Sequence, residues 1–439
     1  MYIRRATPGR RLLVLASLGA VISMGCGDDP ERFPTLEEAP PLQLQSEQVG
    51  VGLFHGDALG LALNREDSMQ ESAEFFEHAF FRVKSYDEFA PVVGEYNSQR
   101  IREENVDFSV RSAADFSISG TAAARLEFRA GDLDEELDRA LEIGQAQGFG
   151  TRSFVVDFWR ERGDWLIRWD GNLAEGTNLE GQGTYGFDRE DMSSSLLSQL
   201  ATVAGDHQPE WIIVGDAMDR LYQAPGYEEG VSRDQLEAFE EFFEAAVEAI
   251  HQASPDTKVG AGFHWENVAG AVAAQLSGTR LDELGEEEVD EAFQEVILPF
   301  AQIGDGVALR SQALHGEMED WSYQFLRRLP HLYGLDKPIV FYSVSTPIES
   351  QSSYAQQRLY LERFSEVTAG LSIEVVAWER LNNVDGVDTS DQSISGRCAS
   401  LTNEEGRIAM KLHRCFDGLF SLFRSKDVFE TFQTLVDEP

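Results

Sequence analysis

Eight short apolar runs recur from Val49 onward, and helical patterns lie between them. Most of the runs are continuous and rich in Val, Ile and Phe, as is typical of parallel strands that are buried on both faces. The runs are 49–55, 123–128, 153–158, 211–215, 257–263, 306–311, 338–344 and 373–378. This recurrence predicts an alternation of strands and helices along most of the chain.

The segments between the runs show helical periodicity. Residues 133–147, 232–254 and 353–367 each place apolar side chains on one stripe, and Pro255 ends the second of them. Strand and helix alternating eight times predicts an α/β fold of the (β/α)8 TIM-barrel class. A doubly wound open sheet is the alternative, but no Gly-rich phosphate loop follows the first run. Alternating residues at 106–110 and 116–119 predict a small β-hairpin before the second barrel strand, and 384–406 reads as a long loop.

The N-terminus has the pattern of an export signal. Four arginines within the first eleven residues precede an apolar segment, 12–22, that is too short to span a bilayer. The following Gly25-Cys26 resembles a bacterial lipobox, although Ser23 stands where such boxes usually have Leu. The resemblance implies acylation of Cys26 and an exported lipoprotein on the periplasmic or cell-surface face of a membrane; plain secretion is the alternative. We therefore expect a signal at 1–26, a disordered tether at 27–48 and a single barrel at 49–439.

Charge and cysteine content limit the partners. The formal net charge is −41, a field that repels nucleic acid and anionic lipid surfaces. With Cys26 acylated, Cys398 and Cys415 remain, and in an exported protein this pair predicts a disulfide. The sequence predicts neither a cofactor nor a metal site. The acidic residues between 132 and 138 follow helical spacing without an EF-hand glycine, which favours a charged helix start over a calcium site.

The residues just beyond each run are the candidates for a site, because chemistry in such barrels lies at the carboxyl ends of the strands. They combine aromatic rings, carboxylates and amides, a set suited to stacking on sugar rings and bonding sugar hydroxyls. They are His55, Asp57, Arg129, Asp157, Trp159, Arg160, Asp216, Asp219, His264, Trp265, Glu266, Arg310, Gln312, Ser343, Ser345, Trp378, Glu379 and Asn382. Carbohydrate is the ligand class that this lining predicts.

Four stretches resemble the clan of retaining (β/α)8 glycoside hydrolases, nearest its endo-β-1,4-galactanase and cellulase-like branches. They correspond to the second, fourth, seventh and eighth strands of the family, in order and over nearly the whole chain after Val49. They are Ala124-Arg125-Leu126, Trp211-Ile-Ile-Val-Gly215, Lys337-Pro-Ile-Val and Val375-Val-Ala-Trp378. The resemblance implies a polysaccharide or oligosaccharide partner.

The resemblance also implies that the catalytic pair is missing. The family mechanism uses two glutamates, one as acid and base and one as nucleophile. Its Asn-Glu pair falls on Asp216 and Ala217, and its nucleophile falls on Ser343. Ala217 cannot transfer a proton, and a serine acts as a nucleophile only beside a base. The residues expected to contact a glycan are Arg125, Asp157, Trp159, His264, Trp265, Gln312, Ser343, Trp378 and Asn382.

Three interpretations remain. The favoured one is a catalytically degenerate, carbohydrate-binding lipoprotein. The second is an active glycoside hydrolase with relocated carboxylates, Asp216 with Glu379 or Glu266. The third is a structural lipoprotein with a vestigial groove. Packing roles compete with site roles, since Asp216 could cap a helix and Trp265 and Trp378 are large enough to belong to the core.

Overall fold

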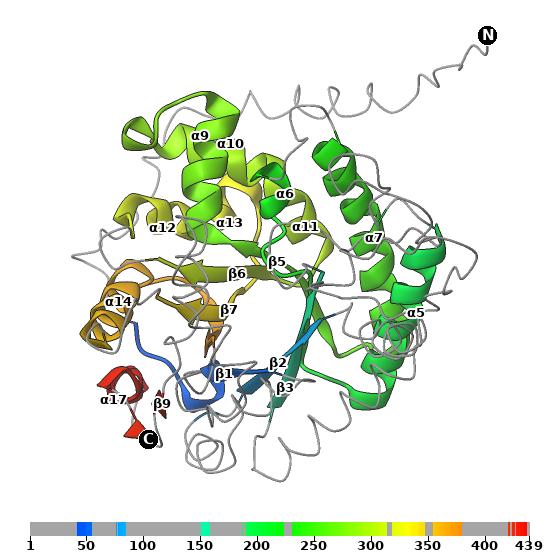
Figure 1. The fold of residues 1–439 in the computed structure, drawn as a ribbon, viewed down its shortest axis with the longest axis horizontal. Helices are drawn as coiled ribbons and strands as arrows, with labels where there is room; N and C mark the ends of the chain where they lie inside the picture. Colours follow the sequence, from blue (N-terminus) through cyan, green and yellow to red (C-terminus); the bar gives the residue numbers. More distant parts are fainter. Residues whose placement is uncertain are drawn as a thin grey trace, which may run out of the picture.

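Eight parallel strands close into a barrel in the computed structural model of the chain (Figure 1). The structure describes residues 42–54, 76, 78–84, 151–158, 187, 190–223, 231–313, 318–346, 354–379, 420–421, 424–425 and 427–436. Each strand pairs with the next one along the chain, and β1 also pairs with β8. The strands are β1 Val49–Phe54, β2 His78–Lys84, β3 Thr151–Asp157, β4 Trp211–Val214, β5 Lys258–His264, β6 Val307–Gln312, β7 Ile339–Ser345 and β8 Ile373–Trp378. The closure confirms the predicted (β/α)8 TIM-barrel fold and excludes the open-sheet alternative.

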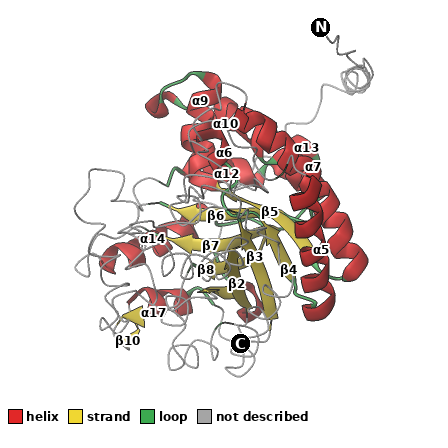
Figure 2. Ribbon diagram, turned by 45° about the vertical axis from the view of Figure 1, so that its right-hand side comes forward, coloured by secondary structure: helices red, strands yellow, loops and turns green. Residues whose placement is uncertain are grey.

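Helices lie outside the strands (Figure 2). The longer ones are α5 Glu190–His207, α7 Val231–Ala253, α10 Glu286–Val296, α12 Asp320–Arg327, α14 Tyr354–Val367 and α17 Asp427–Thr434. Shorter ones are η1 Ser46–Gln48, α6 Arg220–Gln223, α8 Trp265–Asn267, η3 Val268–Val272, α9 Ala273–Ser277, η4 Leu281–Glu283, α11 Leu298–Ile303 and α13 Leu329–Tyr333. Two short strands, β9 Phe420–Ser421 and β10 Arg424–Ser425, form an antiparallel pair. Among the helices that the structure describes, none has both the length and the apolar character needed to cross a bilayer.

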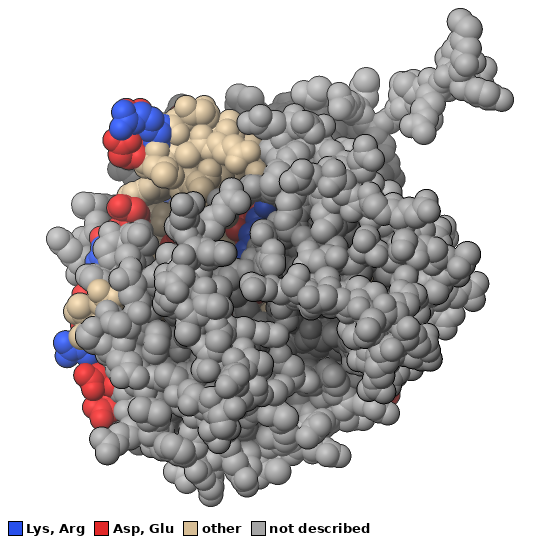
Figure 3. Space-filling view, in the orientation of Figure 1, with Lys and Arg blue, Asp and Glu red and all other residues tan. Residues whose placement is uncertain are grey.

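The connection from β5 to α10 is an excursion at the carboxyl end of the barrel. It runs through α8, the π-helical turn η3, α9 and η4 before α10 begins. Uncharged surface covers the region where Figure 1 places α9, with charged side chains at its edge (Figure 3). The Arg280–Asp282 ion pair, in which both side chains are exposed, belongs to this excursion.

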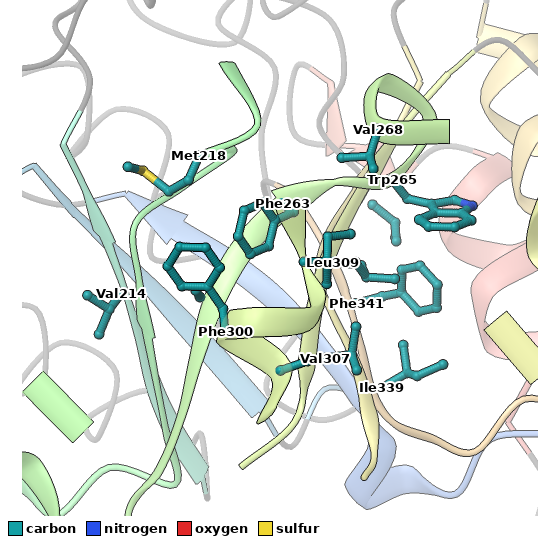
Figure 4. Close-up of a cluster of buried hydrophobic side chains, with 14 of the residues drawn as sticks. Val214, Met218, Phe263, Trp265, Val268, Phe300, Val307, Leu309, Ile339 and Phe341 are labelled. Atoms are coloured by element: carbon teal, nitrogen blue, oxygen red, sulfur yellow. The ribbon is translucent and has the colours of Figure 1, made fainter. Parts of the chain in front are cut away.

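Side chains alternate between two apolar compartments, as the twofold period of a strand requires. On β8, Val375 and Ala377 belong to the cluster inside the barrel, whereas Val376 and Trp378 belong to the cluster between strands and helices. Figure 4 shows the outer cluster where Phe300 of α11 packs beside side chains of the strands. This alternation decides which residue at each strand end can face the barrel axis.

The second strand of the barrel is not the predicted run 123–128. The second position in the barrel is occupied by β2, His78–Lys84, which pairs with both β1 and β3. The predicted strand 123–128 lies outside the described residues, as do the predicted helix 133–147, the hairpin at 106–110 and 116–119, and the loop 384–406. The other seven runs overlap observed strands, and the helices predicted at 232–254 and 353–367 are α7 and α14.

The packed body begins before Val49, where we placed the boundary of the tether. Leu42 and Leu44 are buried, and the backbone N–H of Leu44 donates to the carbonyl of Leu435 at 2.8 Å. The side chain of Gln48 donates to the carbonyl of Ile373 at 2.7 Å. The buried side chains are Leu42 and Leu44, two apolar residues within a segment whose polar composition predicted no packing. The expected tether is therefore corrected to end before Leu42.

Candidate functional site

The carboxyl ends of four strands meet around one buried guanidinium, that of Arg310 on β6. Its Nη1 donates to Asp216 Oδ2 at 3.0 Å and to Oδ1 at 3.3 Å. Its Nη2 donates to Glu379 Oε1 at 2.9 Å and to Gln312 Oε1 at 2.8 Å. The exposed fractions of Arg310, Asp216 and Glu379 are 0%, 2% and 1%. One planar cation therefore bridges two carboxylates that come from the ends of β4 and β8.

Three further side chains complete this cluster. Glu379 Oε2 accepts from Gln312 Nε2 at 2.5 Å and from Ser345 Oγ at 2.6 Å. Asp216 Oδ1 also accepts from the hydroxyl of Tyr342 at 2.9 Å. All four carboxylate oxygens thus have a protein donor. We call these six residues, Arg310, Asp216, Glu379, Gln312, Ser345 and Tyr342, the Arg310 cluster.

Strand alternation and a tight turn place the cluster. Arg310 follows Ala308 on the inner face of β6, and Glu379 follows Ala377 on the inner face of β8. After β4 the chain turns at Gly215, whose φ is +87° and where an added Cβ would approach Met218 within 2.5 Å. Ala217 also has a positive φ, 53°, which is unfavourable for a residue with a side chain. The turn aims Asp216 at Arg310.

Glu266 is held in a separate group of polar side chains between the strands and the helices, which we call the Glu266 cluster. It accepts from Ser311 Oγ and Tyr323 Oη, both at 2.5 Å, and from the backbone N–H of Gln312 at 3.2 Å. His264 Nε2 lies 3.2 Å from Glu266 Oε2. Burial raises the pKa of Glu266, but the hydrogen bonds from His264, Ser311 and Tyr323 outweigh it, so the pKa lies below its ordinary value. Glu266 is therefore a charged acceptor tied into the packing.

Two tyrosines, Tyr323 and Tyr360, belong to the Glu266 cluster. Burial first, and then the charge of Glu266, raise the pKa of Tyr323 well above its ordinary value. The same causes raise the pKa of Tyr360, whose hydroxyl donates to the carbonyl of Ser311 at 3.0 Å. Both phenols are therefore neutral hydrogen-bond donors near neutral pH. The Glu266 cluster joins β6 to α12 and α14, and its carboxylate and both of its phenols are engaged in hydrogen bonds.

The two tryptophans predicted to contact a sugar are packing residues. Trp265 and Trp378 are both 0% exposed. Trp378 packs against Tyr360 and Phe432, on the side of β8 that faces the helices. Trp265 stacks on Phe325. Figure 4 shows the Trp265 indole pointing away from the labelled strand residues Leu309 and Phe341. The expected substrate-stacking role is corrected to a packing role. The twofold alternation of β8 turns the Trp378 indole toward the helices, and Trp265 begins α8, where its indole packs against Phe325.

The two positions where the glycoside hydrolase resemblance places catalytic glutamates are also buried. Ala217 is 0% exposed, and Ser343 is 1% exposed. Ser343 lies at a bulge of β7, where Leu309 pairs with Phe341 and Arg310 pairs with Ser343. Its Oγ has no hydrogen-bond partner among the described residues. No base therefore activates this hydroxyl within the part of the chain that the structure describes.

The remaining predicted site residues divide into two groups. His264 is partly exposed at the carboxyl end of β5, and Gln312 is in the Arg310 cluster. The side chain of Asp157, at the end of β3, lies outside the described residues, as do Arg125, Trp159, Asn382 and the cysteines Cys26, Cys398 and Cys415. Within the described ranges, no group of three or more His, Cys, Asp or Glu side chains is arranged to hold a metal ion.

Sequence reasoning did not identify the bridging role of Arg310. The signal was present, because a charged residue within the apolar run 306–311 is almost never buried unless it is paired. Two acidic residues at the carboxyl ends of other strands, Asp216 after β4 and Glu379 after β8, were the available partners. The hydroxyl of Tyr342, inside a continuous apolar run, gave no comparable signal.

Comparisons with known proteins agree on the fold. No protein-family model matches the chain, and no curated protein matches it. Among solved structures, a GH5_18 variant from Bifidobacterium longum subsp. longum in complex with Manβ1-4GlcNAc has a TM-score of 0.53 at 11% identity, covering 88% of this chain and 77% of the other. GH5_18 from Streptomyces cattleya in complex with GlcNAc has a TM-score of 0.51 at 13% identity, covering 89% and 80%.

A further match, the exo-beta-1,4-mannosidase Op5Man5 from Opitutaceae bacterium strain TAV5, has a TM-score of 0.49 at 12% identity. It covers 92% of this chain, which spans 60% of the mannosidase. The structural neighbours are thus glycoside hydrolase barrels, consistent with the clan that the sequence motifs resemble. Identities this low establish a shared fold and leave the activity to be argued from the site.

Proposed function

We propose that the chain is an exported, glycoside-hydrolase-like barrel lipoprotein that binds carbohydrate at the carboxyl ends of its strands without hydrolysing it. The fold supports the ligand class, because two structural neighbours are complexes with Manβ1-4GlcNAc and with GlcNAc. The partly exposed His264, at the carboxyl end of β5, supplies an imidazole group of the kind that bonds sugar hydroxyls. In this proposal the mouth of the barrel keeps a binding role and lacks a catalytic one.

The observation that carries the proposal is the Arg310 cluster. A retaining glycosidase needs one neutral carboxylic acid to protonate the leaving group and one carboxylate free to attack. Here Asp216 and Glu379 both face a buried guanidinium, and each carboxylate oxygen already accepts a hydrogen bond. Both carboxylates are engaged by this guanidinium and by neutral donors inside the barrel, so neither is free to reach a substrate.

An active hydrolase is the second candidate, and one observation favours it. Arg310 brings Asp216 and Glu379 to the two sides of one guanidinium, which makes them a facing carboxylate pair. For this pair to act, Arg310 would have to leave it, exposing a buried cation and two buried anions. Glu266 is less suited to the role, because Ser311 and Tyr323 bind it outside the strands.

A structural lipoprotein with a vestigial groove is the third candidate. It is supported by the packing roles of Trp265 and Trp378 and by the internal satisfaction of the Arg310 cluster. Localisation belongs to the same proposal: an export signal at 1–26, acylation of Cys26, and a body that starts at Leu42.

Binding to a panel of β-linked mannans, galactans and glucans, measured by calorimetry, tests the proposal. We expect at least one glycan to bind. Substitution His264→Ala should weaken that binding about fivefold, the equivalent of one hydrogen bond of about 1 kcal/mol. The matched control is His331→Ala, an exposed histidine on α13, which should leave binding unchanged. Absence of binding to every glycan would instead support the structural lipoprotein.

A further inference from the structure

The chain enters the barrel at the end opposite the Arg310 cluster. The segment from Gln45 to Gln48 borders a recess of about 500 Å³. The rest of that recess is lined by residues at the amino-terminal starts of strands, among them His78, Glu210, Pro338 and Ile373. The segment that precedes β1 therefore lies across the amino-terminal end of the barrel.

A second contact fixes the start of this segment. Leu44 forms a parallel bridge with Val436, just after the end of α17, and is 1% exposed. Leu42 is 6% exposed. Helices of a (β/α)8 barrel run back from the carboxyl to the amino-terminal ends of the strands, so the end of α17 lies at the amino-terminal end. The position of Leu42 is thus set at the end of the barrel away from the mouth.

We propose that the amino-terminal end of the barrel faces the membrane and the mouth faces away from it. This inference rests on the acylation of Cys26 proposed above. Residues 27–41 link the anchor to Leu42, and even a fully extended chain of that length reaches only about 55 Å. The length is an upper limit that holds for any conformation of the link.

The size of the body excludes the inverted orientation. Residues 42–436 should have a radius of gyration of about 21 Å, which corresponds to a sphere of about 27 Å radius. If the mouth faced the bilayer, the link would have to start at the far pole, pass over the flank and descend to the lipid. The shortest such path is about 70 Å for that radius, longer than the link can reach.

This orientation determines which glycans can reach the mouth of the barrel. A mouth that points away from the anchoring bilayer meets soluble oligosaccharides or polymers in the space beyond it. Sugar headgroups of the same bilayer are out of reach, because the body lies between them and the mouth. The glycan proposed for the site is therefore a free or wall-borne chain and not a membrane glycolipid.

Energy transfer to the bilayer tests the orientation. The acylated full-length protein is placed in vesicles that contain an acceptor-labelled lipid. A donor dye is attached at Asp256→Cys, in the exposed turn between α7 and β5, or at Arg280→Cys, in the excursion after β5. Labelling of the unsubstituted protein measures the background from its own cysteines. We expect transfer from position 256 to exceed that from position 280 at least about twofold, since strand length alone separates the two ends by about 20 Å.

Two further outcomes separate this inference from the anchor itself. Protein that fails to float with the vesicles contradicts acylation, and the orientation falls with it. Protein that floats but transfers equally from both positions, or better from position 280, overturns the orientation alone. Insertion of about 40 Gly and Ser residues after Pro34 should abolish the difference, because the link could then pass around the body.

Discussion

Replacing Arg310 with methionine removes the cation of the Arg310 cluster and keeps a side chain of similar length. Asp216 and Glu379, 2% and 1% exposed, would then face each other without a counter-charge. Both carboxylates sit where water cannot reach them, so the loss of the guanidinium is not made good by hydration. The variant should be strongly destabilised.

The expected size follows from this burial. Removing one partner of a buried ion pair typically costs about 3–5 kcal/mol, because the remaining charge is left uncompensated. Here one substitution leaves two charges, so we expect the free energy of unfolding to fall by at least about 3 kcal/mol. That is a large fraction of the 5–15 kcal/mol that stabilises a typical protein, in round figures about a third.

Urea denaturation at pH 7, followed by circular dichroism, measures this loss. The matched control is Arg280→Met, which removes an arginine that is 74% exposed and pairs with Asp282. Exposed ion pairs are worth about 0–1 kcal/mol, so the control should remain close to the unsubstituted protein. The comparison isolates the effect of burial from that of the chemical change.

A neutral variant supplies the remaining check. Combining Arg310→Met with Asp216→Asn and Glu379→Gln removes all three charges, and it should recover much of the stability lost in the single variant. A loss below about 1 kcal/mol for Arg310→Met would refute the reasoning, since it would mean that the two carboxylates are not held by this guanidinium. So would a triple variant less stable than the single one.

Three other predictions follow from the site and the sequence. The pKa of Glu266 lies below its ordinary value of 4.5, so its ionised form adds stability above about pH 4.5 that is lost as the pH falls through the lowered pKa. Glu266→Gln should therefore flatten the pH dependence of stability measured by denaturation below about pH 4.5. Acylation of Cys26 should keep the protein in membrane fractions, and Cys26→Ser should release it; a wild type that is fully soluble would contradict this. A Cys398–Cys415 disulfide should stabilise the folded protein by about 3 kcal/mol, and two free thiols found by mass spectrometry in exported protein would exclude it.

The fold could be predicted where strands read as continuous apolar runs. Seven runs overlap observed strands, from β1 to β8, because strands buried on both faces carry few polar residues. Strand β2 was missed since His78, Arg82 and Lys84 interrupt its apolar core, Ala79–Phe81, within a charged neighbourhood. The run 123–128 took its place in the prediction because Ala124-Arg125-Leu126 resembles the second-strand segment of the glycoside hydrolase clan.

The site was predictable in its location but not in its pairings. Parallel strands bring their carboxyl ends together, so Asp216, Gln312 and Glu379 were expected in one region, and they meet there. The direction of each side chain depends on a twofold alternation whose phase the sequence leaves open in a run that is apolar throughout. Trp378 faces the helices while Glu379, its neighbour, faces the barrel axis. A shift of one residue reverses the role of each.

Turnover tests the central claim most directly. Aryl β-glycosides and the β-linked mannans, galactans and glucans are incubated with the purified protein, and released phenol and reducing ends are followed. The account predicts no hydrolysis above the uncatalysed rate, in the same preparation that binds a glycan by calorimetry. Robust hydrolysis that disappears in Asp216→Asn or Glu379→Gln would contradict it, and would show that Arg310 releases a working carboxylate pair.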